Sequence, residues 1–226
     1  LAMAGVKLIG ARASPFGNRV QIALNLKSID YEFFEEIYGS FSKFLLKSNP
    51  VHKKLPVLIH DDKAICESLI IVQYIDEVWT SGHSILPSDP YDRATARFWA
   101  AYIDEKCFSS LSELRLAKGE NEKLAAANRL FEMLGLLEEV FVNCSTEGGK
   151  GFFGGDKIGY LDIALGGFLG WLKAMEKLVG VKLLDEKRTP ELMGWAERFI
   201  ADNAVKGVIP EIEELLEFAK KYLPKA

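Results

Sequence analysis

Two patterns of hydrophobic and polar residues divide this chain of 226 residues. In residues 4–80, short apolar runs rich in β-favouring residues alternate with segments in which apolar residues recur every three or four positions. The runs predict strands and the periodic segments predict helices. In residues 93–226 the strand-like runs largely disappear and helical periodicity dominates. The pattern therefore predicts an α/β domain at 4–80, followed by an all-α domain at 93–226.

The order of elements in the first domain follows from these runs. Strands are expected at residues 6–10 and 31–37, with a helix from Ser14 to about Lys27 between them. A strand–helix–strand unit of this kind forms a parallel pair through a right-handed crossover. The remaining elements expected in this domain are a short helix, a β-hairpin and a longer helix, at residues 42–48, 53–66 and 67–79.

A linker and the helices of the second domain complete the expected arrangement. The linker is placed at 81–92, because turn-forming Gly, Ser and Pro residues gather there. The first helix after it spans about 91–118, and the next carries apolar residues at helical spacing between Leu130 and Phe141. The other helices expected are one from near Tyr160 through Met175 and two that start at about Pro190 and Pro210.

Two helix starts in the first domain are suited to binding an anion. Ser14 precedes Pro15, and serine is a favoured N-cap while proline is a favoured first helical residue. Ser68 can cap the later helix. Free amides and the dipole at a helix N-terminus stabilise negative charge and lower the pKa of a thiol placed there. One such start is typical of an ordinary cap, but the pair is compatible with one elongated acidic ligand.

Pro56 lies at the entry of a strand-like run, where a proline costs no ladder hydrogen bond. A cis bond between Leu55 and Pro56 would turn the chain there and leave the Leu55 backbone free for a ligand. Most X-Pro bonds are trans. The residues by themselves therefore leave the isomer open.

Composition and charge exclude several kinds of partner. The formal net charge is −4, and no basic cluster is interleaved with aromatic residues, so no nucleic-acid surface is expected. No apolar run is long enough to span a membrane. The three cysteines form no CxxC pair and the three histidines lack ligand spacing, so neither a disulfide framework nor a metal site is expected. A reducing, cytoplasmic setting is the default.

Four short motifs occur in order along the chain. They are Ser14-Pro15-Phe16 with Arg19-Val20; Asn49-Pro50-Val51-His52-Lys53-Lys54-Leu55-Pro56-Val57-Leu58; Glu67-Ser68 through Tyr74-Ile75-Asp76-Glu77; and Phe152-Phe153-Gly154-Gly155-Asp156 through Gly159-Tyr160-Leu161-Asp162. At these separations they resemble the tau class of plant glutathione transferases along nearly the whole chain. The resemblance implies a thioredoxin-like first domain, a helical second domain, a homodimer and a cis Leu55–Pro56 bond.

The resemblance also implies a glutathione site on the first domain. Ser14 matches the family's catalytic serine, whose hydroxyl hydrogen bond to the glutathione sulfur favours the thiolate. Glu67 and Ser68 match residues that hold the γ-glutamyl ammonium and carboxylate. Leu55 matches a residue whose backbone pairs with the cysteinyl unit, and Lys54 matches a lysine of the same pocket. Glutathione is then a co-substrate, and no permanently bound cofactor is expected.

A broader apolar site is implied between the domains. We expect Phe16, Phe108, Leu111 and Arg115 to line it, because the last three lie at spacings of three and four on one helix. For Leu111, core packing is an equally good interpretation. The last helix is a candidate for closing the site, although its pattern equally suits packing on the bundle. Asp162 matches a capping residue of the family, for which we expect a structural role.

Phe41 departs from the family pattern, which has a lysine there that contacts the glycyl carboxylate. Losing a charge-assisted hydrogen bond costs roughly 1.5–3 kcal/mol, so we hypothesise weaker glutathione binding unless Lys43, Lys53 or Lys54 compensates. The expected function is conjugation of glutathione to hydrophobic electrophiles, with reduction of organic hydroperoxides as a side activity. The alternative is a carrier of hydrophobic ligands with little turnover, which Phe41 keeps open.

Overall fold

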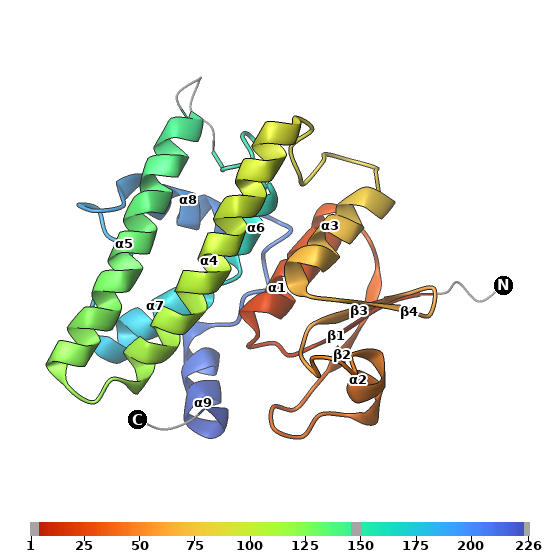
Figure 1. Ribbon diagram of the computed structural model, residues 1–226, viewed down its shortest axis with the longest axis horizontal. Helices are drawn as coiled ribbons and strands as arrows, with labels where there is room; N and C mark the ends of the chain where they lie inside the picture. Colours follow the sequence, from red (N-terminus) through yellow and green to blue (C-terminus); the bar gives the residue numbers. More distant parts are fainter. Residues whose placement is uncertain (1–4, 146–150, 224–226) are drawn as a thin grey trace.

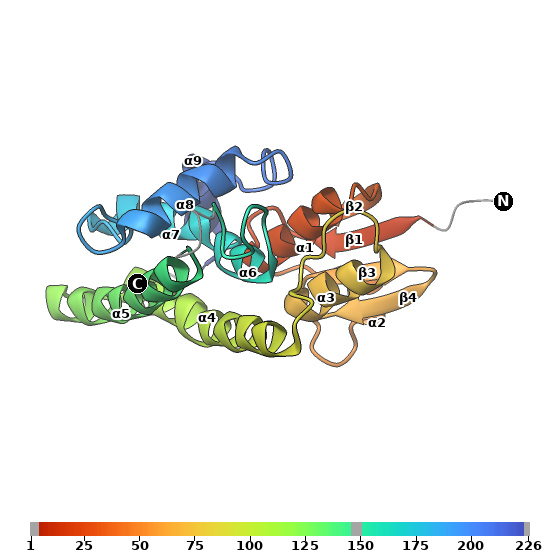
Figure 2. The same cartoon turned by 90° about the horizontal axis from the view of Figure 1, so that it is seen from above.

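The computed structural model describes residues 5–145 and 151–223 (Figure 1). A small sheet with its helices forms one part and a group of helices forms the other, and the two lie side by side (Figure 2). This arrangement confirms the predicted fold class, an α/β domain followed by an all-α domain. No helix in the described ranges is both long enough and apolar enough to cross a bilayer.

Four strands form the sheet, in the order β2-β1-β3-β4. β1 (Val6–Gly10) and β2 (Tyr31–Glu35) are parallel and are joined through α1 (Pro15–Leu26). β3 (Val57–His60) runs antiparallel to β1 and forms a hairpin with β4 (Lys63–Cys66). The predicted strand–helix–strand unit and the predicted hairpin are both confirmed.

Side-chain alternation along the strands gives the sheet two covered faces. Leu8 of β1 belongs to the main core, which it shares with α1 and α3 (Ser68–Val78). Its neighbour Ile9 belongs to a smaller core with Leu45 of α2 (Lys43–Ser48). Figure 1 accordingly shows α2 on the opposite side of the strands from α3.

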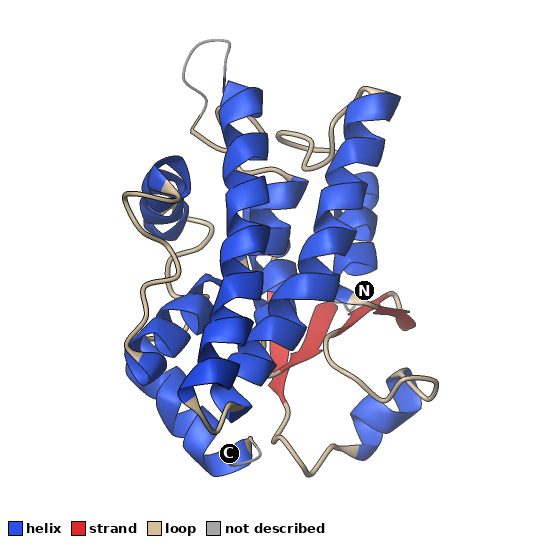
Figure 3. Cartoon of the chain, turned by 60° about the vertical axis from the view of Figure 1, so that its left-hand side comes forward, coloured by secondary structure: helices blue, strands red, loops and turns tan. Residues whose placement is uncertain are grey.

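Two long helices that lie alongside each other dominate the second part (Figure 3). Behind them, the shorter α6 packs on both the first long helix and α1, and so joins the two parts. The helices are α4 (Pro90–Leu116), α5 (Glu120–Ser145), α6 (Tyr160–Gly166), α7 (Leu169–Val179), α8 (Pro190–Ala201) and α9 (Ile212–Tyr222).

The prediction of one continuous helix from Tyr160 through Met175 is wrong. The segment forms two helices, α6 and α7, which are separated by Gly167 and Phe168. The break lies against α1, where a Cβ on Gly167 would come within 2.6 Å of the Pro15 carbonyl oxygen. Both helices bury apolar residues, and the helical spacing of these residues continues through the break. The hydrophobic pattern therefore did not indicate that the helix ends there.

Two predicted helix starts also differ from the structure. α9 begins at Ile212, two residues later than predicted, because the N-cap Glu211 is extended with ψ 152°. In α3 the N-cap position is Glu67, and Ser68 is the first helical residue rather than the cap. The Ser68 hydroxyl accepts a hydrogen bond from the Arg19 guanidinium instead of from its own helix.

Asp76 of α3 anchors the chain that leads into the second part. Its carboxylate accepts hydrogen bonds from the backbone N–H groups of Ile85 and Leu86, at 2.8 and 2.9 Å, and from the Ser84 hydroxyl. Its Oδ1 also lies 2.8 Å from Nζ of Lys27, and both side chains of this ion pair are buried. The partners satisfy a buried carboxylate that would otherwise be costly.

Candidate functional site

Ser14 is the N-cap of α1, as predicted. Its Oγ accepts a hydrogen bond from the backbone N–H of Gly17 at 3.2 Å. A hydroxyl has one hydrogen to donate in addition to its acceptor lone pairs. Accepting from Gly17 therefore leaves the Ser14 hydrogen for a second partner, at a helix end whose dipole favours a negative charge.

The register of the sheet brings the predicted glutathione residues to one edge. Ile9, Val57 and Cys66 are aligned across β1, β3 and β4. Ser14 follows the end of β1, whereas Leu55 precedes the start of β3, and antiparallel pairing puts these two strand ends together. Glu67 and Ser68 follow the end of β4 and so lie at the same edge. Three separate motifs thus meet where the sheet ends.

The loop that carries Lys54 and Leu55 is held by Asn49, which is buried. The Asn49 side chain accepts a hydrogen bond from His52 N at 3.1 Å and donates one to the Lys54 carbonyl oxygen at 3.0 Å. The Lys54 side chain is exposed and Leu55 is half-buried. The bond between Leu55 and Pro56 is cis, which confirms the isomer that the resemblance implied.

Glu67 adopts an unusual backbone conformation between β4 and α3, with φ 70° and ψ 116°. Non-glycine residues with positive φ are uncommon, and such strain is concentrated at functional sites. The Glu67 side chain is exposed at the helix start, where the first-turn amides have no intrahelical acceptors. The Glu67 carboxylate therefore lies beside backbone N–H donors of the first turn. A ligand that carries both an ammonium and a carboxylate would need this pair of partners.

Arg19 joins this helix start to the second part of the molecule. Its fully buried guanidinium donates to Ser68 Oγ at 3.2 Å, to Asp104 Oδ1 at 2.6 Å and twice to the Ala164 carbonyl oxygen. The Ser68 hydroxyl is thereby oriented, and its own hydrogen remains for a ligand. The sequence motif contained Arg19, but the sequence analysis gave it no role because its partners are remote in the chain.

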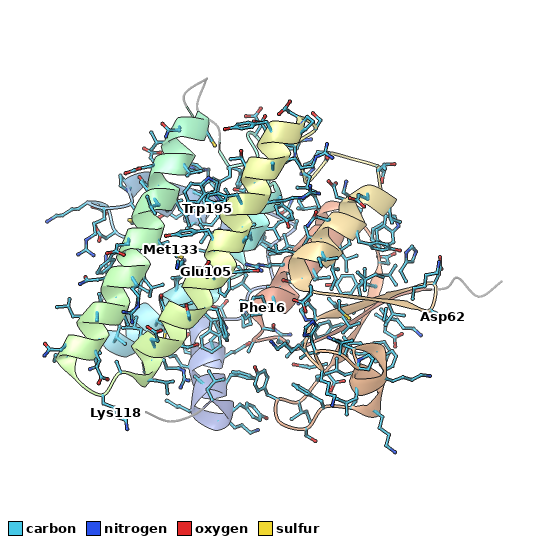
Figure 4. The ribbon with its side chains drawn as sticks, in the orientation of Figure 1. Phe16, Asp62, Glu105, Lys118, Met133 and Trp195 are labelled. Atoms are coloured by element: carbon cyan, nitrogen blue, oxygen red, sulfur yellow. The ribbon has the colours of Figure 1, made fainter. Side chains whose placement is uncertain are left out.

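An apolar cavity of about 400 Å³ lies beside Ser14 and is lined by residues from both parts. All four residues expected in the apolar site line it: Phe16, Phe108, Leu111 and Arg115. Figure 4 shows Phe16 where α1 approaches α4. Leu111 is 7% exposed, so it serves both the cavity and the core.

Among the described residues, five further aromatic side chains line the cavity: Tyr38, Phe168, Trp171, Phe218 and Tyr222. None was predicted individually as a site residue, although the last helix, which carries Phe218 and Tyr222, was a candidate for closing the site. Tyr38 comes from the turn after β2, Trp171 from α7 and Phe218 from α9. The Trp171 indole N–H donates to the Ala13 carbonyl oxygen at 2.8 Å, which fixes its ring beside the start of α1. The last helix thus closes one end of the cavity and also packs on α7, so both interpretations of its pattern hold.

Comparison with known families shows which family the chain belongs to. The family model for the N-terminal domain of glutathione S-transferases matches residues 8–78, and the model for the C-terminal domain matches residues 91–203.

The chain belongs to the glutathione S-transferase family.

Known relatives place this transferase in the tau class, which confirms the resemblance. Glutathione S-transferase U17 of Arabidopsis thaliana is 61% identical over 226 residues, which is 100% of this chain and 99% of the relative. A crystal structure of a tau-class enzyme from mango, Mangifera indica, has a TM-score of 0.93 at 61% identity, and covers 99% of this chain and 100% of that one. A rice glutathione transferase solved in complex with glutathione has a TM-score of 0.86 at 35% identity, with 97% and 96% covered.

Phe41 of this transferase lies in the loop between β2 and α2, near Leu55. Its side chain is half-buried and packs against the smaller core, to which Leu45 and Leu55 also contribute. Its ring also packs against the ring of Tyr38, with centroids 6.1 Å apart. Phe41 therefore packs against apolar neighbours, whereas the lysine of the family pattern would place a positive charge at this position. Lys43 and Lys53, named as possible substitutes for the missing cation, have exposed side chains.

Asp162 has the capping geometry that the resemblance implied. Its buried carboxylate accepts four hydrogen bonds, from the backbone N–H groups of Phe153, Gly154 and Gly159 and from the Trp195 indole, at 2.7–2.9 Å. Burial raises the pKa of this carboxyl to about 6, against the effect of the four donors. The carboxylate connects the loop before α6 to α8 and lies within the second part.

Cys66, at the end of β4, is the cysteine nearest in the chain to Glu67 and Ser68. Cys66 is half-buried, and burial together with the nearby Glu67 carboxylate raises the pKa of its thiol, which makes it a weak nucleophile at neutral pH. Within the described part of the chain, no group of three or more His, Cys, Asp or Glu residues is arranged to hold a metal ion.

Proposed function

We propose that this transferase conjugates reduced glutathione to hydrophobic electrophiles, and that Ser14 stabilises the glutathione thiolate. The observation that carries the proposal is the Ser14 hydroxyl, which accepts from Gly17 N–H and lines an apolar cavity. A hydrogen bond from this hydroxyl to the glutathione sulfur favours the charged form and lowers the pKa of the thiol. Glutathione is the nucleophile, so Ser14 forms no covalent intermediate.

The rest of the glutathione molecule extends along the edge of the sheet. In our proposal the Glu67 carboxylate pairs with the γ-glutamyl ammonium, and the amide and hydroxyl of Ser68 bind the γ-glutamyl carboxylate. The Leu55 backbone pairs with the cysteinyl unit, and Lys54 contributes a cation to the same pocket. The shared edge of β1, β3 and β4 supports this arrangement, and the rice relative was solved in complex with glutathione.

The electrophile occupies the cavity lined by Phe16, Phe108, Leu111 and Arg115. Holding both reactants together supplies proximity, and the serine supplies electrostatic stabilisation of the attacking sulfur. The same thiolate reduces organic hydroperoxides as a side activity. An apolar wall of this kind discriminates weakly between substrates of similar size, so we infer a broad range of electrophiles.

We also infer a cytoplasmic homodimer. Four apolar side chains on α3 and α4 support a contact surface, because they are 42–79% exposed: Ile70, Val78, Tyr91 and Phe98. Burial of such side chains between two copies of the chain would stabilise a dimer. Sedimentation of the purified chain at micromolar concentration tests the dimer directly.

A carrier of hydrophobic ligands is the second candidate function, and Phe41 is the observation that favours it. Its ring lies near the glutathione edge, where a cation would strengthen binding of the glycyl carboxylate. Phe41→Lys should therefore lower the Michaelis constant for glutathione, by up to about ten- to a hundredfold if a charge-assisted hydrogen bond is restored. An unchanged constant would show that Lys43, Lys53 or Lys54 already supplies the charge.

The decisive experiment follows the ultraviolet absorbance of bound glutathione thiolate as a function of pH. The native protein should ionise the thiol well below its ordinary pKa of about 8.5, and Ser14→Ala should raise that value by about 1–2 units. Ser112→Ala is the matched control, because Ser112 lines the same cavity from α4. Equal thiolate in native protein and Ser14→Ala would refute the role of Ser14. Absence of glutathione binding at millimolar concentration would favour the carrier.

A further inference from the structure

The turn between β2 and α2 is held in one conformation by its own polar groups. The buried Glu36 carboxylate accepts hydrogen bonds from both the backbone N–H and the hydroxyl of Ser42, the N-cap of α2. Inside this closure, Ser40 N donates to the Ile37 carbonyl oxygen at 3.0 Å, and Gly39 has φ 86°. Tyr38 and Gly39 lie at the tip of this turn.

Tyr38 lies between two other aromatic rings. The Phe41 ring packs against it at 6.1 Å between centroids and 73° between planes, and the Phe218 ring meets it at 5.5 Å and 85°. We call Phe41, Tyr38 and Phe218 the aromatic clasp. Phe218 is also packed on Trp171 and Tyr222, at 6.3 and 5.1 Å. All of these rings except Phe41 line the cavity.

Within the clasp, the contact between Tyr38 and Phe218 joins α9 to the first domain. Leu215 is the one fully buried residue of this helix. The ion pairs Arg12–Glu214 and Lys177–Glu213 join α9 to its neighbours, but all four side chains are more than half exposed. Exposed ion pairs contribute little because water and salt screen them. The contact between the rings of Tyr38 and Phe218 therefore helps to set the position of α9 beside the cavity.

We propose that the aromatic clasp determines specificity, by favouring planar aromatic electrophiles over aliphatic ones of similar size. The proposal deepens the proposed function and rests on it. Tyr38 and Phe218 both line the cavity and contact each other. A flat aromatic ligand beside them gains edge-to-face or offset contacts beyond its buried area. An aliphatic ligand gains only the area. Each aromatic pair is worth about two- to twelvefold in affinity.

Phe41 is a positioning residue in this scheme, since its ring touches Tyr38 and does not line the cavity. Phe41→Leu keeps an apolar side chain against the smaller core but removes the edge-to-face contact that supports Tyr38. We therefore expect this variant to lose part of the aromatic preference without a change in the Michaelis constant for glutathione. Loss through a general effect on folding would lower activity toward both classes of electrophile equally.

The experiment compares kcat/KM for chlorodinitrobenzene, a planar aromatic electrophile, with kcat/KM for an alkyl isothiocyanate. Tyr38→Leu and Phe218→Leu should each lower the ratio of the two constants by about two- to twelvefold, and Phe41→Leu by a smaller factor. Phe44→Leu is the matched control, because the Phe44 ring packs on Phe34 at 5.4 Å and does not line the cavity. The double variant of Tyr38 and Phe218 should show less than the product of the single effects.

An unchanged ratio in Tyr38→Leu and Phe218→Leu would overturn the proposal. Should the native chain catalyse no conjugation, the proposed function fails, and binding then tests the clasp separately. Fluorescence titration with anilinonaphthalene sulfonate measures the affinity for an aromatic ligand, and displacement of this dye by decanoate measures the affinity for an aliphatic one. The ratio of the two affinities reports the aromatic preference without turnover. Weaker aromatic binding in Tyr38→Leu with decanoate unaffected supports the clasp, and equal loss of both ligands overturns it.

Discussion

Replacement of Arg19 by methionine is expected to destabilise the protein strongly. The guanidinium is fully buried and satisfies acceptors from three elements: Ser68 Oγ in α3, Asp104 Oδ1 in α4 and the Ala164 carbonyl oxygen in α6. Ala164 is in the last turn of α6, and the helix breaks before this carbonyl receives its usual backbone donor. Phe168 N donates to Leu165 instead.

The magnitude follows from the acceptors that Arg19→Met leaves behind. Methionine preserves much of the packing, and replacing a buried charge by an apolar side chain can be nearly neutral when no partner remains. Here the partners do remain. A buried hydroxyl and a buried carbonyl without donors cost about 1–3 kcal/mol each, whereas the carboxylate of Asp104, at 36% exposed, is partly rescued by water. The sum is about 2–6 kcal/mol, a large share of an ordinary stability of about 5–15 kcal/mol.

Equilibrium unfolding in urea, followed by tryptophan fluorescence, measures this loss. Arg12→Met is the control, because Arg12 is exposed and its 3.8 Å contact with Glu214 should be worth less than about 1 kcal/mol. Arg19→Lys should fall between the two, since one ammonium group cannot reach all three acceptors. The Michaelis constant for glutathione should also rise in Arg19→Met as Ser68 loses its orienting donor. A free energy of unfolding equal to that of Arg12→Met would refute the reasoning.

Three further predictions concern buried polar groups and close packing, each measured by urea unfolding. Asp162→Asn places an NH₂ group against two N–H donors and should cost about 3–6 kcal/mol, whereas Asp156→Asn, at an exposed aspartate, should change stability by less than about 0.5 kcal/mol. Gly167→Ala should destabilise, because its Cβ meets a backbone oxygen of α1 at 2.6 Å; Gly135→Ala in α5, where a Cβ meets nothing within 4 Å, should instead stabilise by about 0.5–1 kcal/mol. Burial raises the pKa of Asp76, but the Ile85 and Leu86 amides and Lys27 outweigh it and hold this pKa below 3.8. The Asp76 carboxylate should contribute its full stabilisation at pH values about one unit above 3.8, and should lose it as the pH falls through the lowered pKa. In Asp76→Asn the free energy of unfolding should therefore fall less steeply with decreasing pH. An unchanged slope would show that Asp76 does not cause the loss of stability in acid.

Local chemistry in the sequence determined much of this transferase. Ser14 followed by Pro15 fixed the start of α1, because capping and proline geometry depend on immediate neighbours. The alternation of strand and helix patterns up to about residue 80 gave the order of elements, since periodicity depends only on which face is buried. Motif resemblance identified the class, and helical spacing placed Phe108 and Leu111 on the same side of α4, where they line the cavity.

The tertiary structure decided what depends on contact between remote segments. Arg19 and Ala164 are 145 residues apart, and no spacing in the chain indicates that one satisfies the other. The break between α6 and α7 at Gly167 exists because α1 passes so close, although the apolar pattern continues through it. Tyr38 and Phe218 meet only when the first and last thirds of the chain fold against each other. Caps and periodicity are properties of neighbouring residues, whereas a shared site arises from surfaces that become neighbours only after folding.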